Sequence, residues 1–174
     1  MFNIKVGDIF EEVTEGYIMH GCNAQGVMGS GVAKIVKDRY FEAFKVYAQQ
    51  HPHYILGEVI PKKVTDDLVI VNAITQDQFG THQVQVDYDA VEQACRGAKH
   101  LAASKMVESR EVHFPFIGAG LAGGDEHMLL TIFEQQFHEG TDDCNPDKIN
   151  GTLWLLPDHW MAQEIIKSEL FKNQ

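Results

Sequence analysis

The feature that most constrains this chain is a pair of glycine-rich segments, each lying between an apolar run and an amphipathic run. The first, 20–37, carries Gly26, Gly29 and Gly31, and the second, 118–125, carries four glycines. A glycine-rich turn from a strand into a helix leaves main-chain N–H groups free and directs the positive end of a helix dipole outward. Such turns bind anions, phosphate in particular. Two of them predict a ligand gripped from both sides.

The charge balance narrows the class of ligand. The chain has 174 residues, and its 25 acidic and 14 basic residues give a net charge of −11. This length predicts a single domain over 1–174. An acidic chain repels polyanions, so we expect no broad nucleic-acid-binding surface. A small phosphate ligand remains compatible, because main-chain N–H groups attract it locally.

The cysteines and the apolar runs exclude several other classes. Cys22, Cys95 and Cys144 are widely spaced and form no C-x-x-C pair, so we expect neither a disulfide framework nor a zinc site. We expect no cofactor. The first residues do not have the layout of a signal peptide, and no apolar run approaches the roughly 18–20 residues needed to cross a bilayer. A cytoplasmic location without a membrane partner is therefore expected.

Hydrophobic periodicity predicts alternating strands and helices. The expected strands are 2–6, 17–22, 54–60, 68–74, 112–117 and 152–156. The expected helices are 31–49, one after Asp87 or Asp89, one opening at Asp125, and 158–171. The residues of the third helix expected to face inward are Met128, Leu129, Ile132, Phe133 and Phe137. Polar loops are expected at 61–67, 75–87 and 140–151. This alternation predicts an α/β fold with a mostly parallel sheet, made mixed by an antiparallel pair within 54–74.

The glycine segments fit neither common nucleotide motif. Neither is followed by Gly-Lys-Ser/Thr, and neither matches G-x-G-x-x-G with an acidic residue about twenty positions on. Four motifs together resemble the macro domain family of ADP-ribose binders: Gly7-Asp8-Ile9, 23–33, Asn72-Ala73-Ile74-Thr75-Gln76, and 117–125. The resemblance runs over 2–156 and is closest to the branch described as ADP-ribose-1″-phosphate phosphatases. It implies a three-layer α/β/α sandwich around a mixed sheet.

The resemblance also implies a ligand-binding set. Asp8 would accept a hydrogen bond from the adenine amino group, with the N–H of Ile9 on the ring; the alternative is that Asp8 only ends a strand. The remaining implied contacts, to the diphosphate and the distal ribose, come from Asn23, Gly29, Ser30, Gly31, Val32, Thr75, Gln76, Ile117, Gly118, Ala119, Gly120, Leu121 and Ala122. For adenine stacking, Phe79, Tyr88, Trp154 and Trp160 stay open.

Three residues are candidates for catalysis. His20 takes the place of a histidine seen in phosphatase members of the family, although a lone histidine in an apolar strand is more often a core residue. Asp125 would act with it in proton transfer, or would instead serve as a helix N-cap. Asn23 would hold the distal ribose, or would be a turn residue in the left-handed conformation.

The resemblance predicts hydrolysis of ADP-ribose-1″-phosphate, and two alternatives stay open. One is a non-enzymatic reader of ADP-ribose or of ADP-ribosylated protein. The other is a hydrolase that removes ADP-ribose or O-acetyl groups from conjugates. The lysine-dependent form of that hydrolase is disfavoured, because Gln76 and Ala122 occupy the positions of its lysine and aspartate, and an amide cannot replace an amine nucleophile.

Overall fold

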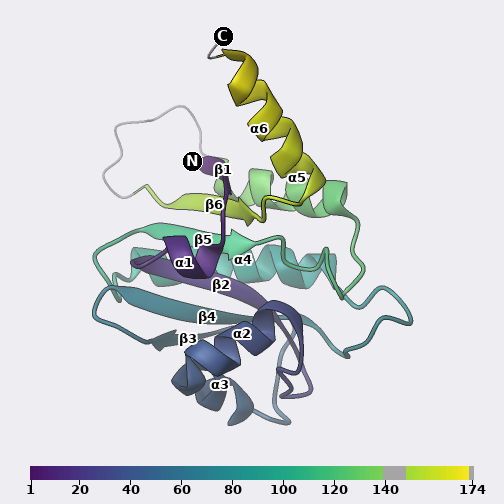
Figure 1. Ribbon diagram of the computed structural model, residues 1–174. Coiled ribbons are helices and arrows are strands. Elements are labelled where there is room, and N and C mark those ends of the chain that lie inside the picture. The colour runs from purple at the N-terminus through teal and green to yellow at the C-terminus, as the bar shows by residue number, and fades with distance from the viewer. Residues whose placement is uncertain (139–147, 173–174) are drawn as a thin grey trace.

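Six strands form one mixed sheet in the computed structural model, which describes residues 1–138 and 148–172 (Figure 1). The strands are β1 (Phe2–Val6), β2 (Gly16–Asn23), β3 (Val59–Lys63), β4 (Leu68–Gln76), β5 (Glu111–Pro115) and β6 (Asn150–Leu155). Their order is β1-β6-β5-β2-β4-β3, and only the β3–β4 pair is antiparallel. The predicted α/β class with a mixed sheet is confirmed.

Helices cover both faces of the sheet. α1 (Ile9–Glu12), α2 (Gly31–Arg39) and α3 (Phe41–Ala48) lie in front of it in Figure 1, and α4 (Tyr88–Ala103) and α5 (Glu126–Phe137) lie behind. The central strand β2 shows why two layers are needed. Tyr17 and Met19 pack into the core under α4 and α5, and Ile18 packs into the core under α2 and α3. Since successive side chains of a strand point to opposite faces, an apolar β2 requires cover on both.

The C-terminal helix α6 (Trp160–Lys172) extends away from the sheet at the top of Figure 1. Its Ala162 is fully buried against the core that contains α5. Among the described residues, no helix is long and apolar enough to cross a membrane.

The parallel register brings three strand ends to one edge of the sheet. β2 runs alongside β4 from Gly16 and Leu68 onward, and alongside β5 at Tyr17 and Val112. The loops that follow β2, β4 and β5 therefore leave from the same edge, which is where open α/β sheets bind ligands. Both glycine-rich segments are among these loops.

The predicted helix 31–49 is in fact two helices. Tyr40, with φ −127° and ψ 60°, leaves the helical conformation, and its N–H bonds to Val36 O at the end of α2. The N–H of Ala43 then bonds to Tyr40 O and begins α3. Both helices bury an apolar face against the same side of the sheet, so the hydrophobic period continues across the break and the sequence pattern does not reveal it.

One strand boundary was also wrong, and one helix was not predicted. The strand expected at 54–60 lies at Val59–Lys63, because Gly57 takes a positive φ of +85° that ends extended structure. Pro61 is tolerated there because β3 is an edge strand. The short helix α1 was not predicted; Asp8 caps it by accepting a hydrogen bond from the N–H of Phe10 at 2.9 Å.

The helix after Asp125 begins as expected, and most of its predicted inner face is confirmed. Leu129, Phe133 and Phe137 form a buried stripe, and Ile132 packs against the same core. The prediction for Met128 was wrong, because it lies one position before this stripe and is exposed. Most of the loop expected at 140–151, with Cys144, lies outside the described residues.

Candidate functional site

The two glycine-rich loops face one cleft of about 620 Å³ at this edge of the sheet. Clefts of roughly 300–1,000 Å³ suit small-molecule ligands. Most of the predicted ligand set lines it: Asn23, Gly29, Ser30, Gly31, Val32, Thr75, Gln76, Ile117, Gly118, Gly120, Leu121 and Ala122. Asp8, Ile9 and Ala119 are not among the lining residues.

The two loops approach each other across the cleft, and their glycines permit this. Gly31 has a φ of +57°, and a Cβ on it would lie 3.5 Å from Cδ1 of Leu121 in the opposite loop. Gly118 has a φ of +87°, and a Cβ there would lie only 2.6 Å from Val86. Other residues adopt such φ values at a cost, and at Gly118 no space exists for a side chain. The loop path therefore depends on glycine at these positions.

Residues whose main-chain N–H groups have no acceptor within the described part of the protein line the cleft on both sides. Gly31, Val32 and Ala33 form the first turn of α2 and line the cleft, and N–H groups in a first turn have no acceptor inside the helix. In the opposite loop, the Gly124 N–H bonds to Gly118 O at 2.8 Å and closes the turn. The hydrogen bonds of the described residues use none of the N–H groups of Gly120, Leu121 and Ala122. Such a pair of donor sets is suited to an extended anion.

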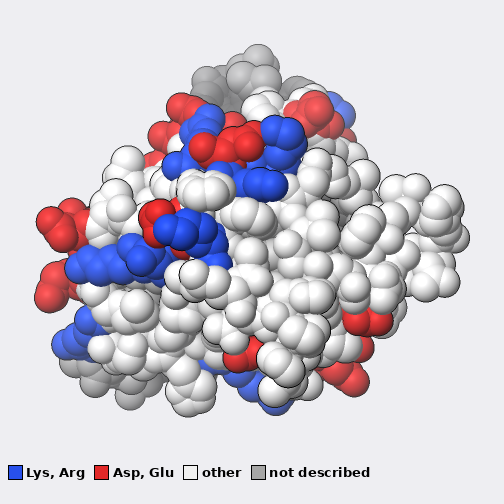
Figure 2. Space-filling model, turned by 90° about the horizontal axis from the view of Figure 1, so that it is seen from below, with Lys and Arg blue, Asp and Glu red and all other residues white. Residues whose placement is uncertain are grey.

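No Lys, Arg, Asp, Glu or His is among the described residues that line the cleft. Figure 2 shows charged side chains gathered on parts of the surface and a broad region without them, which continues onto the lobe at the right. Although the chain has 25 acidic residues, none of the described residues that line this cleft carries a carboxylate. Attraction of an anion here depends on main-chain dipoles rather than on basic side chains.

Asn23 is held in the wall of the cleft by its own loop. Its Oδ1 accepts hydrogen bonds from Gln25 N at 3.0 Å and from the Tyr47 hydroxyl at 3.0 Å, and its Nδ2 donates to Val27 O at 2.7 Å. These partners fix the orientation of the amide. One N–H of Nδ2 remains for a ligand, so Asn23 both shapes the loop and offers a donor. Its φ is not positive, so it is not the left-handed turn residue considered as the alternative.

His20 does not reach the cleft. It is fully buried, and its Nε2 lies 2.9 Å from Oδ1 of Asn72, whose Nδ2 donates to Ala43 O and Ile60 O. Because the amide of Asn72 presents its oxygen, the ring carries its proton on Nε2. Burial lowers the pKa of His20 to about 4, so the ring is neutral at pH 7. The core role, and not the predicted proton transfer, fits this environment.

No protein-family model matches the chain. A curated protein of Meyerozyma guilliermondii named ADP-ribose 1″-phosphate phosphatase is 24% identical over 168 residues, which is 94% of this chain and 90% of that protein. Proteins of the same name from Neosartorya fischeri and Aspergillus fumigatus are 44% identical over 41 residues, 24% of this chain. The chain matches only 20% of the length of these two fungal relatives.

Solved structures match over nearly the whole fold. The macrodomain of Mycobacterium tuberculosis DarG superposes with a TM-score of 0.73 at 18% identity and covers 88% of this chain and 97% of its own. The protein has the macrodomain fold. Thermosipho africanus DarTG, solved in complex with ADP-ribose, has a TM-score of 0.69 at 16% identity and covers 90% of this macrodomain and 42% of its own chain. The predicted likeness to the macro domain family and the α/β/α sandwich are confirmed.

Asp125 of this macrodomain acts as a helix cap. Its carboxylate accepts a hydrogen bond from Met128 N at 3.0 Å, its own N–H donates to the Tyr88 hydroxyl at 2.9 Å, and it does not line the cleft. We expect Asp125→Ala to lower the free energy of unfolding by about 1 kcal/mol and to leave ligand affinity unchanged. Urea unfolding and calorimetry would measure the two quantities. A loss of affinity at unchanged stability would contradict this expectation and would indicate that Asp125 contributes to ligand binding.

Of the four aromatic side chains considered for stacking, Phe79 alone lines the cleft, and it is 57% exposed. The Tyr88 hydroxyl accepts a hydrogen bond from the Asp125 N–H, and Trp160 donates from Nε1 to Glu126 at 2.5 Å. Trp154 is buried and donates from Nε1 to Nδ1 of His113 at 3.2 Å. Of the four stacking candidates, Phe79 is therefore the one placed at the cleft.

Several lining residues of this macrodomain were not predicted. Val27, Gly80, Thr81 and Phe116 line the cleft, and Tyr47 supports it from behind. Within the segment 79–81, only Phe79 was a candidate, for stacking on adenine. The loop 77–87 protrudes at the right of Figure 1, next to the opposite glycine loop. In the sequence, this loop is a polar stretch with one Phe and one Gly between a predicted strand and a predicted helix. Such a stretch is typical of a binding loop.

The described residues contain no group of three His, Cys, Asp or Glu side chains that could hold a metal ion.

Proposed function

We propose that this macrodomain binds ADP-ribose in the cleft and hydrolyses the phosphate ester of ADP-ribose-1″-phosphate. The observation that carries the binding proposal is the convergence of two sets of free main-chain N–H groups, at 31–33 and 120–122, on one uncharged cleft. A diphosphate between them would accept hydrogen bonds from both sides. The curated relatives named as phosphatases support the choice of ester.

The reaction we propose needs water at the distal end of the ligand. Water attacks phosphorus and the bond from phosphorus to the C1″ oxygen breaks. A proton from the attacking water passes through solvent to the C1″ oxygen, and ADP-ribose and inorganic phosphate leave. The proton-transfer roles first considered for His20 and Asp125 are not part of this proposal, since neither lines the cleft. Main-chain N–H groups would stabilise the phosphoryl oxygens, and the free N–H of Asn23 would hold the distal ribose.

The direct test is release of phosphate from ADP-ribose-1″-phosphate, followed together with the appearance of ADP-ribose. We expect equimolar products from the wild-type protein. The His20→Asn variant, which removes a core partner of Asn72 but no lining group, would report whether that histidine matters beyond stability. Absence of phosphate release above a heat-treated control would refute the hydrolytic part.

Phe79 is proposed to stack on the adenine ring. Stacking between a base and an aromatic side chain is worth about 1–3 kcal/mol, so Phe79→Ala should weaken ADP-ribose binding roughly 5- to 150-fold. Trp160→Ala is the matched control, because it also removes an exposed aromatic ring and lies outside the cleft. Calorimetric titration would measure both variants. Equal affinities for Phe79→Ala and wild type would refute the stacking role.

The proposed contact of Asp8 with adenine would use the carboxylate oxygen that does not cap α1. Its Oδ1 already accepts the Phe10 N–H, so Oδ2 would take the adenine amino group. The Asp8→Asn variant tests this contact, since an amide retains a capping oxygen but offers its NH₂ group in place of Oδ2.

A non-enzymatic reader of ADP-ribosylated protein is the second candidate. The observation that favours it is the lack of any carboxylate, histidine or lysine among the described lining residues, because general acid–base catalysis commonly uses such groups. Binding of ADP-ribose without turnover of the 1″-phosphate, the O-acetyl ester or an ADP-ribosylated protein would favour this reading. Gln76, which lines the cleft and donates to Gln78 O at 2.7 Å, offers no amine nucleophile for removal of ADP-ribose.

A further inference from the structure

A buried tyrosine hydroxyl lies directly behind the first glycine-rich loop. Tyr47, near the end of α3, is fully buried, and its hydroxyl oxygen is 2.7 Å from Asn23 O and 3.0 Å from Asn23 Oδ1. A hydroxyl has one proton to donate, so the two acceptors of Asn23 share it. Burial raises the pKa of Tyr47, and the group therefore keeps its proton and remains a donor.

The residue that Tyr47 holds is the one that closes the loop. Oδ1 of Asn23 also accepts from Gln25 N at 3.0 Å and Val27 N at 3.3 Å, while Nδ2 donates to Val27 O at 2.7 Å. Residues 23–27 thus form a small hydrogen-bonded loop around one amide. Among the described residues, only Tyr47 ties that amide to another element of the fold. The main chain of the loop is also tied to the end of β4, where Ala24 N bonds to Gln76 O at 2.9 Å, so the hydroxyl of Tyr47 fixes the amide and the turn around it.

Tyr47 is itself anchored to the sheet and to the chain that follows α3. Asn72 in β4 donates from Nδ2 to Ala43 O in α3 at 3.1 Å, and His20 in β2 bonds to Oδ1 of the same side chain at 2.9 Å. The Tyr54 hydroxyl donates to Tyr47 O at 2.8 Å, with the two rings 5.2 Å apart. Buried and fully paired polar networks of this kind fix one arrangement of the elements they join.

We propose that Tyr47 is a positioning residue for the ligand site: its hydroxyl holds loop 23–27 so that the N–H groups at the start of α2 face the cleft. The inference rests on the proposed function for the identity of the ligand, but the loop geometry it describes exists without ligand. A loop held in the binding conformation before the ligand arrives does not have to be ordered on binding, and this raises affinity.

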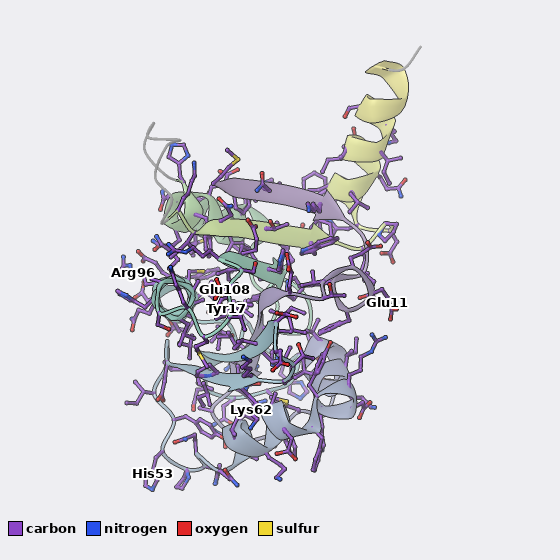
Figure 3. The ribbon with its side chains drawn as sticks, turned by 90° about the vertical axis from the view of Figure 1, so that its left-hand side faces the viewer. Glu11, Tyr17, His53, Lys62, Arg96 and Glu108 are labelled. Atoms are coloured by element: carbon purple, nitrogen blue, oxygen red, sulfur yellow. The ribbon has the colours of Figure 1, made fainter. Side chains whose placement is uncertain are left out.

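The test compares Tyr47→Phe with Tyr17→Phe. Both tyrosines are fully buried, and the Tyr17 hydroxyl also takes part in two hydrogen bonds: it donates to Leu101 O and accepts from Met106 N, each at 3.1 Å. Tyr17 lies on the far side of the sheet from α3, beside α4 (Figure 3). The pair therefore matches the loss of one buried hydroxyl and differs in whether that hydroxyl supports the loop.

Three quantities would be measured: the stability to urea, the Kd for ADP-ribose, and the hydrogen exchange of the Gln25 and Val27 N–H groups without ligand. We expect both variants to lose stability, and only Tyr47→Phe to show at least tenfold faster exchange at these two groups and about tenfold weaker binding. Exchange in Tyr47→Phe equal to that in Tyr17→Phe would overturn the proposal.

The outcomes separate this inference from the proposed function. If wild-type protein fails to bind ADP-ribose, the proposed function fails, and the exchange measurement alone still judges the role of Tyr47 in the loop. If wild type binds and both tyrosine variants lose affinity equally, the effect is one of general stability and the positioning role is refuted.

Discussion

Gly120→Glu is expected to weaken ADP-ribose binding at least about 100-fold. Gly120 lines the cleft, and no atom lies within 4 Å of where its Cβ would be, so a side chain there meets open space and leaves the fold intact. A carboxylate at this point would face the diphosphate. Two unit charges about 5 Å apart at an effective dielectric constant of about 20 repel by about 3 kcal/mol, which is enough for this loss. Calorimetric titration measures it directly.

Gly120→Gln is the matched control, because glutamine has nearly the size of glutamate and no charge. We expect it to bind within about tenfold of wild type and to unfold at the same urea concentration as Gly120→Glu. Equal affinities for the two variants would contradict a diphosphate near Gly120. A 100-fold loss in both would mean that steric exclusion, and not charge, explains the effect.

The second large effect concerns stability in acid. Burial lowers the pKa of both His20 and His113 to about 4, whereas unfolding returns each ring to its ordinary value of 6.5. The unfolded state therefore binds protons that the folded state does not, between about pH 6.5 and pH 4. The contribution of the two histidines to the free energy of unfolding is fully present above about pH 6.5. It is lost as the pH drops through this window, by about 2 kcal/mol for each histidine at pH 4.5.

Urea unfolding at pH 7 and at pH 4.5 would measure this change. Carboxylates also titrate in this range, so the difference between variants is the informative quantity. In His113→Phe, the loss of stability between the two pH values should be smaller than in wild type by about 2 kcal/mol. The exposed His53, at the edge of the molecule in Figure 3, provides the control variant His53→Asn, which should keep the wild-type difference. Identical differences in all three proteins would contradict the account.

Much of the fold was predictable because its elements repeat one pattern. Strand β2, helix α4 with its cap at Asp87, strand β4 and the antiparallel pairing within 54–74 follow from periodicity and capping. The break at Tyr40 was not predictable, because the apolar period continues across it. The start of β3 was predicted too early, because the sequence does not show that Gly57 takes a positive φ. The four-residue helix α1 is too short for a periodic signal.

The cleft was predictable where it consists of main chain and less so where side chains matter. Glycines such as Gly31 and Gly118 mark positions that need a positive φ, so the sequence itself locates both loops. The direction of His20 was not predictable in the same way, because a strand buried on both faces gives no sign of which face meets the ligand. The partners that determine its role are distant in the sequence: Asn72 is 52 residues from His20, and Ala43 of α3, which Asn72 also contacts, is 23 residues from it. No local pattern reveals such contacts.

The most direct test of the central claim is a crystal structure of this protein with ADP-ribose. The account predicts a diphosphate within hydrogen-bond distance of N–H groups at 31–33 on one side and at 120–122 on the other, with a neutral His20 still bonded to Asn72. A nucleotide bound elsewhere, or a diphosphate held by lysine or arginine side chains outside the two loops, would contradict it.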